Sequence, residues 1–107
     1  MIKVGPEKKV ENEIKKYLDR IGAYYVKIHG SAFMPAGTPD ILVCLPGGKF
    51  MGIEVKKPGG GVVSPLQALK LKIINNCGGI GIVAESVDDV KFAIKKYKES
   101  IRIKEGD

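Results

Sequence analysis

Three charged residues stand at the ends of two short apolar runs of this 107-residue chain. Asp40 precedes the run at residues 41–45, and Glu54 and Lys56 close the run that starts at Phe50. Two carboxylates offer hard oxygen ligands, and an ammonium group beside them offers hydrogen bonds to an anion or a water molecule. If the three side chains meet, they form a small site suited to a hard divalent cation and a bound water.

Whether they meet depends on the segment between the runs, residues 46–49. Its sequence, Pro-Gly-Gly-Lys, predicts a tight turn and therefore a β-hairpin. A two-residue loop would place Asp40 opposite Val55, and a three-residue loop would place it opposite Glu54. Because side chains alternate along a strand, Glu54 and Lys56 share one face in either register, and the two carboxylates lie close together. The alternative is an exposed hairpin with ordinary cross-strand charge pairs.

Two further polar residues could reach this site. Glu11 lies beside the apolar stripe of the first predicted helix, so it would approach the carboxylates if that stripe packs on the sheet. Gln67 lies one turn into the second predicted helix and could hydrogen-bond a phosphate group or orient a ligand. For each residue the alternative is a solvated position on the surface. His29, the sole histidine, lies in a loop of small residues, and we expect it to be incidental.

The elements that must position these residues follow the order αβββαβα in a single domain over residues 1–107. The predicted helices begin near residues 6, 65 and 86, and the predicted strands cover residues 23–28, 41–45, 50–56 and 80–84. The last strand is entirely apolar or glycine, so we expect it to be central and buried. The second helix is expected to pack through its large apolar side chains, which are Leu66, Leu69, Ile73 and Ile74. The tail after about residue 102 is expected to fray.

The composition favours a folded protein with a polyanionic partner. The formal charge is +6, from 18 Lys and Arg against 12 Asp and Glu, so nucleic acid is the first partner to consider. Solvated lysine-rich faces are the alternative. No apolar stretch approaches the roughly 20 residues that span a bilayer, and the N-terminus lacks a secretion signal, so we expect no membrane association. Cys44 and Cys77 have no metal-ligand spacing and are expected to be reduced in the cytoplasm.

Neither glycine cluster fits a phosphate-binding loop. Residues 59–61 lack the Lys and the Ser or Thr of a P-loop, and residues 78–81 lie after a helix and before a strand, the reverse of a dinucleotide-binding loop. A small nucleotide-binding α/β protein is therefore disfavoured.

The ordered motifs resemble one family of nucleases. Pro39-Asp40 followed by Glu54-Val55-Lys56 is similar to the PD-(D/E)XK signature of restriction-endonuclease-like enzymes, and the details look like the VRR-NUC branch (virus-type replication-repair nuclease). The matching segments are residues 37–41, 46–48, 53–59, 64–67 and 78–79, and the resemblance runs from about residue 7 to residue 90. Each motif is short, but the ordered set is specific.

The resemblance implies a restriction-endonuclease-like α/β fold, with a mixed central sheet flanked by helices, and metal-dependent hydrolysis of DNA phosphodiester bonds with Mg²⁺ or Mn²⁺. It implies Asp40, Glu54 and the carbonyl of Val55 as metal ligands. Lys56 would be the catalytic lysine, able to orient the attacking water or stabilise charge on the phosphate. Gln67 matches the family glutamine that follows the lysine motif.

Glu11 stands where this branch often has Gln, and in this respect the chain resembles the archaeal Holliday junction resolvases. The position implies a further metal ligand, whose carboxylate could support a second ion. Stand-alone members of this size resemble homodimeric enzymes that resolve branched DNA, which implies a homodimer acting on structures such as four-way junctions. The alternative is a DNA-binding module that keeps the fold without cutting. Basic residues that could contact the DNA backbone are Lys27, Lys49, Lys57, Lys70 and Lys72.

A homodimer needs an exposed apolar surface, for which the sequence offers three candidates. These are the first helix, the loop around Phe33 and Met34, and the last helix. The expected location is the cytoplasm of a prokaryotic or phage-infected cell, where phage, mobile-element and cellular repair settings all suit such an enzyme.

Overall fold

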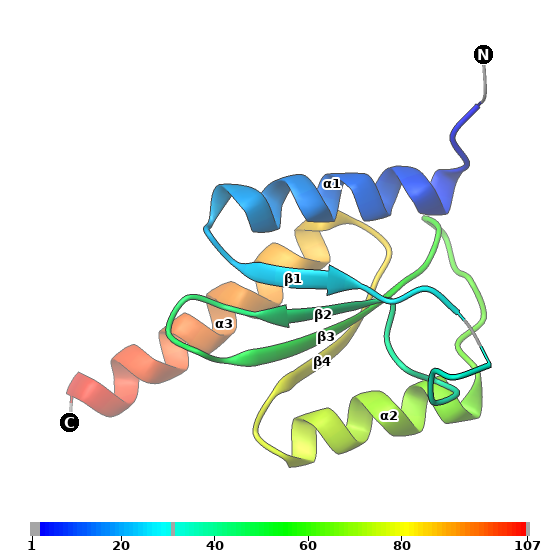
Figure 1. The fold of residues 1–107 in the computed structure, drawn as a ribbon. Helices are drawn as coiled ribbons and strands as arrows, with labels where there is room; N and C mark the ends of the chain where they lie inside the picture. The colour runs from blue at the N-terminus through cyan, green and yellow to red at the C-terminus, as the bar shows by residue number, and fades with distance from the viewer. Residues whose placement is uncertain (1–2, 31, 107) are drawn as a thin grey trace.

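The computed structural model describes residues 3–30 and 32–106, which form one four-stranded sheet with helices on both of its faces (Figure 1). The strands are β1 (Tyr24–Lys27), β2 (Ile41–Cys44), β3 (Phe50–Val55) and β4 (Ile80–Ala84), in that order across the sheet. The first three strands pair antiparallel, and β4 pairs parallel to β3. The mixed sheet confirms the predicted α/β architecture.

Helices α1 (Pro6–Arg20) and α3 (Val87–Gly106) cover one face of the sheet, and α2 (Pro65–Asn76) covers the other (Figure 1). α2 forms the crossover between β3 and β4, which parallel strands require because a short turn cannot join them. The element order αβββαβα is confirmed. None of the helices in the described residues is both long and apolar enough to cross a membrane.

The turn between β2 and β3 fixes which residues face each other across the hairpin. Gly48 N–H donates to the carbonyl of Leu45 at 2.8 Å, and Leu45 N–H donates to the carbonyl of Lys49 at 2.9 Å. Gly47 and Gly48 both have positive φ angles, 97° and 95°, which glycine adopts without strain. Ile41 therefore pairs with Ile53. This is the three-residue register, in which Asp40 comes opposite Glu54.

The sheet face under α1 and α3 carries the hydrophobic core. Its buried side chains from the helices are Val10, Ile14, Leu18, Val90 and Ile94, and those from β2 and β3 are Ile41, Val43, Met51, Ile53 and Val55. Because side chains alternate along a strand, residues 40, 52, 54 and 56 face the opposite way. The fold therefore turns Asp40, Glu54 and Lys56 toward α2, away from the main core.

The prediction that residues 80–84 form a central strand was wrong, because β4 lies at an edge of the sheet. Four of its residues are half-buried and only Ala84 is fully buried. α2 and α3 both pack on this strand, one on each face. The continuous apolar sequence thus reflects two covered faces, which an edge strand can also have.

The prediction for the apolar face of α2 was also largely wrong. Leu66, Leu69 and Ile73 are exposed, whereas Leu71 is buried and Ile74 packs on the sheet. Glycines let the helix approach closely along that side: a Cβ at Gly81 would lie 2.5 Å from the carbonyl oxygen of Leu71, and one at Gly52 would lie 2.7 Å from Ile74 Cδ1. This close approach leaves a large apolar ridge of α2 uncovered.

The last helix is longer than expected. Residues 103–106, predicted to fray, continue α3 as regular helix to Gly106. This segment contains lysine and glutamate, whose helix propensity is high enough to extend an existing helix by another turn. Asp107 lies outside the described residues.

Candidate functional site

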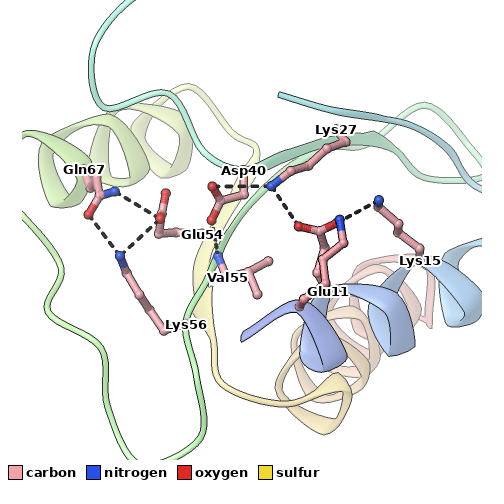
Figure 2. A network of polar contacts seen from close by, with 9 residues as sticks. Glu11, Lys15, Lys27, Asp40, Glu54, Val55, Lys56 and Gln67 are labelled. Carbon is pink, nitrogen blue, oxygen red and sulfur yellow. Dashed lines mark hydrogen bonds and ion pairs between the residues drawn. The ribbon is translucent and has the colours of Figure 1, made fainter. Parts of the chain in front are cut away.

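The carboxylates of Asp40 and Glu54 meet at the end of the β2–β3 hairpin, on the side that faces α2 (Figure 2). Asp40 Oδ2 accepts a hydrogen bond from the backbone N–H of Val55 at 2.8 Å, which fixes its orientation. The Asp40 side chain is 27% exposed, whereas Glu54 is only 3% exposed. Asp40 is thus the solvent-accessible carboxylate of the pair, and Glu54 is the buried one.

The two oxygens of Glu54 have different surroundings. Oε2 accepts from Gln67 Nε2 at 3.1 Å and lies 3.4 Å from Lys56 Nζ. Oε1 is buried and has no hydrogen-bond partner among the described residues. A buried carboxylate oxygen without a donor is costly, because desolvation removes its water without a replacement. The free lone pairs of Oε1 are therefore suited to an added cation.

The raised pKa of Glu54 also indicates that its negative charge is poorly compensated. Burial, and then the negative charge of nearby Asp40, raise its pKa from 4.5 to about 7, although Lys56 acts in the opposite direction. Two adjacent carboxylates in a poorly solvated position favour either a shared proton or a metal ion. The oxygen donors suit a hard divalent cation such as Mg²⁺ or Mn²⁺.

Gln67 links β3 to the start of α2. Its side-chain oxygen accepts from Ser64 N–H at 2.9 Å and lies 3.4 Å from Lys56 Nζ, while its amide nitrogen donates to Glu54. Ser64 Oγ in turn accepts from Gln67 N–H at 3.1 Å, which completes a capping box. The amide orientation is therefore set by the helix cap. The predicted start of this helix near residue 65 is confirmed, with Ser64 as its N-cap.

Glu11 lies on the other side of the sheet, on α1, where three ammonium groups surround it (Figure 2). Its Oε2 pairs with Lys8 at 2.7 Å and Lys15 at 2.8 Å, and its Oε1 pairs with Lys27 at 2.9 Å. Burial alone would raise its pKa, but hydrogen bonds from Lys15, Lys8 and Lys27 outweigh burial and lower the pKa to about 2. Unlike Glu54, Glu11 has a full set of positive partners.

Lys27 connects Glu11 to the carboxylate pair. Its Nζ lies 2.9 Å from Glu11 Oε1 and 3.7 Å from Asp40 Oδ1. Sequence reasoning counted Lys27 only among residues that could contact a DNA backbone. The structure places it at the end of β1, opposite Ile41, which follows Asp40 in the chain, and the sequence alone gives no register for this pair of strands.

The predicted site residues thus fall into two groups. Asp40, Glu54, Lys56 and Gln67 converge around one position, and Glu11 reaches Asp40 only through Lys27. Within the described residues, no three His, Cys, Asp or Glu side chains cluster closely enough to hold a metal ion together. A metal ion here would therefore take Asp40, Glu54 and a main-chain oxygen, with the Val55 carbonyl as the candidate.

The site opens on a pocket on the Asp40 side. This pocket of about 240 Å³ is lined by Asp40 and by Ile28 and the loop that leads to β2, including Met34, Pro35 and Thr38. Its walls are partly apolar, and Asp40 brings a carboxylate to its edge. The pocket could therefore admit a substrate group to the carboxylates.

Solved structures resemble most of this chain in fold. One, described as "VRR_NUC domain", superposes with a TM-score of 0.74 at 26% identity and covers 88% of this chain and 99% of its own. Another, described as "VRR_NUC domain protein", gives a TM-score of 0.70 at 21% identity and covers 90% of each chain. No family model and no curated protein matches the sequence. The likeness in fold, together with the Pro39-Asp40 and Glu54-Val55-Lys56 motifs, supports a VRR-NUC domain with a nuclease-like fold.

Proposed function

We propose that this single domain hydrolyses DNA phosphodiester bonds with Mg²⁺ or Mn²⁺. The observation that carries the proposal is the buried Glu54, whose Oε1 has no hydrogen-bond partner among the described residues and whose Oε2 lies 3.4 Å from Lys56 Nζ. Asp40, Glu54 and the Val55 carbonyl would hold the ion. When bound, such an ion supplies Lewis acidity at the phosphate and lowers the pKa of a coordinated water.

Lys56 is the residue that would act on the attacking water. Its side chain is 13% exposed, and its ammonium group lies between Glu54 Oε2 and Gln67 Oε1, at 3.4 Å from each. It can orient a water for in-line attack on phosphorus and stabilise the negative charge that develops as the bond to the leaving oxygen breaks. Gln67 keeps the lysine and the glutamate in register, so it acts as a positioning residue.

The substrate we propose is branched DNA, such as a four-way junction, cut by a homodimer. The formal charge of +6 favours binding to a polyanion. An exposed apolar ridge on α2 supports self-association, with Leu66, Leu69 and Ile73 exposed by 40%, 50% and 46%. Two copies would bring two sites to two strands. We place this activity in the cytoplasm of a prokaryotic or phage-infected cell.

A DNA panel tests the activity directly. Linear duplex, single strand, flap and four-way junction are each incubated with Mg²⁺ and with EDTA. We expect cleavage of the junction with Mg²⁺ only. Lys56→Ala should bind the junction and fail to cut it, whereas Lys104→Ala removes an exposed lysine of α3 and serves as the matched control. Normal cleavage by Lys56→Ala would refute the catalytic role, and binding without cleavage by the wild type would favour the non-cleaving module.

The homodimer has its own test. Light scattering after gel filtration should give twice the monomer mass for the wild type and the monomer mass for Leu69→Glu, which puts a charge on the ridge. Ile103→Glu changes an exposed apolar residue of α3 and is the comparison variant. A wild-type monomer would refute the dimer.

A further inference from the structure

Lys27 holds the position that a second cation would need. Its ammonium group lies between two carboxylates, 2.9 Å from Glu11 Oε1 and 3.7 Å from Asp40 Oδ1. Its side chain is only 21% exposed, so water screens the attraction between these charges only weakly. In Figure 2 the ammonium group stands between the α1 residue and the hairpin residue and bridges them.

The topology of the sheet explains why a side chain can stand there. Lys27 ends β1 and pairs with Ile41, which is fully buried under α1, so the two side chains share that face. Asp40 precedes Ile41 and turns to the opposite face, toward α2. Glu11 and Asp40 therefore approach the sheet from opposite sides, and Lys27 reaches around the end of β2 to contact both.

We propose that Lys27 is a built-in cation that limits this nuclease site to one divalent ion and keeps Glu11 from ligating metal. The inference rests on the proposed function, since it concerns the same metal site. The expected ion would occupy the Asp40–Glu54 side, where Glu54 Oε1 has no hydrogen-bond partner in the part of the chain that the structure describes. A second ion between Asp40 and Glu11 would have to displace the Lys27 ammonium group or bind against its charge.

The surroundings of Glu11 strengthen this argument. Lys8 and Lys15 occupy its Oε2, so Oε1 is the oxygen that could turn to a shared metal ion, and Lys27 occupies Oε1. Lys8 and Lys15 come from the same helix as Glu11 and pair with it alone among the described residues. Of the described residues, Lys27 is the one that pairs with both Glu11 and Asp40. It is therefore the side chain whose removal should change the metal count.

The test is the number of Mn²⁺ ions bound without DNA. Metal-free protein is titrated with Mn²⁺ at pH 8, and free Mn²⁺ is counted by its electron paramagnetic resonance signal. We expect one bound ion in the wild type and in Lys27→Arg, which keeps the charge. We expect two in Lys27→Met, which keeps the length without the charge, and the spectrum of this variant should broaden because two ions sharing Asp40 would lie roughly 4 Å apart. The double variant Lys27→Met with Glu11→Gln should return to one ion.

Each result has a defined meaning. Two ions in the wild type, or one ion in folded Lys27→Met, would overturn the inference. If thermal melting shows that Lys27→Met does not fold, Glu11→Gln decides: one ion with unchanged affinity supports the inference, and a tenfold loss of affinity overturns it. A wild type that binds no Mn²⁺ and cuts no DNA would overturn the proposed function itself, whereas two ions in an active enzyme would overturn this inference alone.

Discussion

Glu11 and Glu54 are two buried carboxylates on opposite faces of one sheet, with opposite electrostatic surroundings. Glu11 is 5% exposed and Glu54 is 3% exposed, so burial does not separate them. Three lysines lower the pKa of Glu11 to about 2, while burial and the adjacent Asp40 raise the pKa of Glu54 to about 7. The first charge is compensated by the protein, and the second needs something the protein does not supply.

The origin of the partners explains this difference. Glu11 receives Lys8 and Lys15 from its own helix, three residues before it and four residues after it, where side chains are neighbours by construction. Glu54 has a like charge across the hairpin, the ammonium group of Lys56 at 3.4 Å, and a hydrogen bond from Gln67 of α2. A carboxylate compensated by its own helix is suited to holding structure, and a carboxylate strained by a like charge is suited to binding a cation.

The largest expected effect is on cleavage. Glu54→Gln and Asp40→Asn should each lower the rate of junction cleavage by about 10³-fold, because losing a metal ligand removes several kcal/mol of charge stabilisation. The rate is measured under single-turnover conditions with Mg²⁺. Glu13→Gln, which neutralises an exposed glutamate of α1, is the control and should cleave normally. Cleavage within tenfold of wild type by both site variants would contradict the assignment of the pair.

A smaller effect is expected at the residue that joins the site to α2. Gln67→Ala should lower the cleavage rate by roughly 10–100-fold, as losses of supporting hydrogen bonds at metal sites do. Gln67→Glu keeps an oxygen for the Ser64 N–H but cannot donate to Glu54. If the two variants lose activity equally while only Gln67→Ala loses stability, the bond to Glu54 is what supports catalysis. Full activity in Gln67→Glu would show that the cap alone matters.

Metal affinity should depend on pH through Glu54 and not through Glu11. A proton must leave Glu54 before an ion binds, so the affinity for Mn²⁺ should fall about tenfold from pH 8 to pH 6, given a pKa of about 7. Glu11 stays ionised throughout this range because its pKa is about 2. Calorimetric titration at the two pH values checks the slope. An affinity that does not change between them would contradict the raised pKa.

The smallest effects, on stability, should have opposite signs at the two carboxylates. In EDTA at pH 8, Glu54→Gln should raise the free energy of unfolding by roughly 1–3 kcal/mol, because it removes a buried charge beside Asp40. Glu11→Gln should lower it by roughly 1–3 kcal/mol, because three lysines lose their partner. Urea unfolding measures both changes. Two changes of the same sign would refute the contrast between the carboxylates.

The pH dependence of stability sharpens the same contrast. The pKa of Glu11 is lowered, so its stabilising contribution is complete above about pH 4.5 and is lost as the pH falls toward 2. The pKa of Glu54 is raised, so the folded state binds the extra proton, and stability falls as the pH rises from about 4.5 to 7. The free energy of unfolding is measured by urea for wild type and each Gln variant across this pH range. The difference between wild type and variant gives the pH range over which each carboxylate affects stability. If the difference for either carboxylate does not change with pH over its range, the shifted pKa of that carboxylate is contradicted.

Much of the fold could be predicted because its signals are local. Turn residues set the hairpin, Ser64 and Pro65 mark the start of α2, and the apolar stripe of α1 is the one that the core buries. The sequence left two hairpin registers open, and the hydrogen bonds around Gly48 decide between them. The choice matters because one register brings Asp40 opposite Glu54.

What failed depends on packing between elements. The exposed ridge of α2 has a regular helical spacing, so its sequence pattern resembles a buried face, but glycines in β3 and β4 draw a different face onto the sheet. Two of the three partners of Glu11 could be predicted from the sequence, since Lys8 and Lys15 lie at helical spacing from it. Lys27 and the opposite faces of the sheet become apparent only once β1 is paired with β2.

The amide of Gln67 belongs at once to the first turn of a helix and to the cluster around Glu54. Unwinding of the first turn of α2 would therefore also break the hydrogen bond from Gln67 to Glu54, even if the rest of the domain stayed folded. Ligands that bind at the cluster should in turn protect the amide protons in the first turn of α2 from exchange with solvent, so that hydrogen exchange in this helix would report whether the site is occupied.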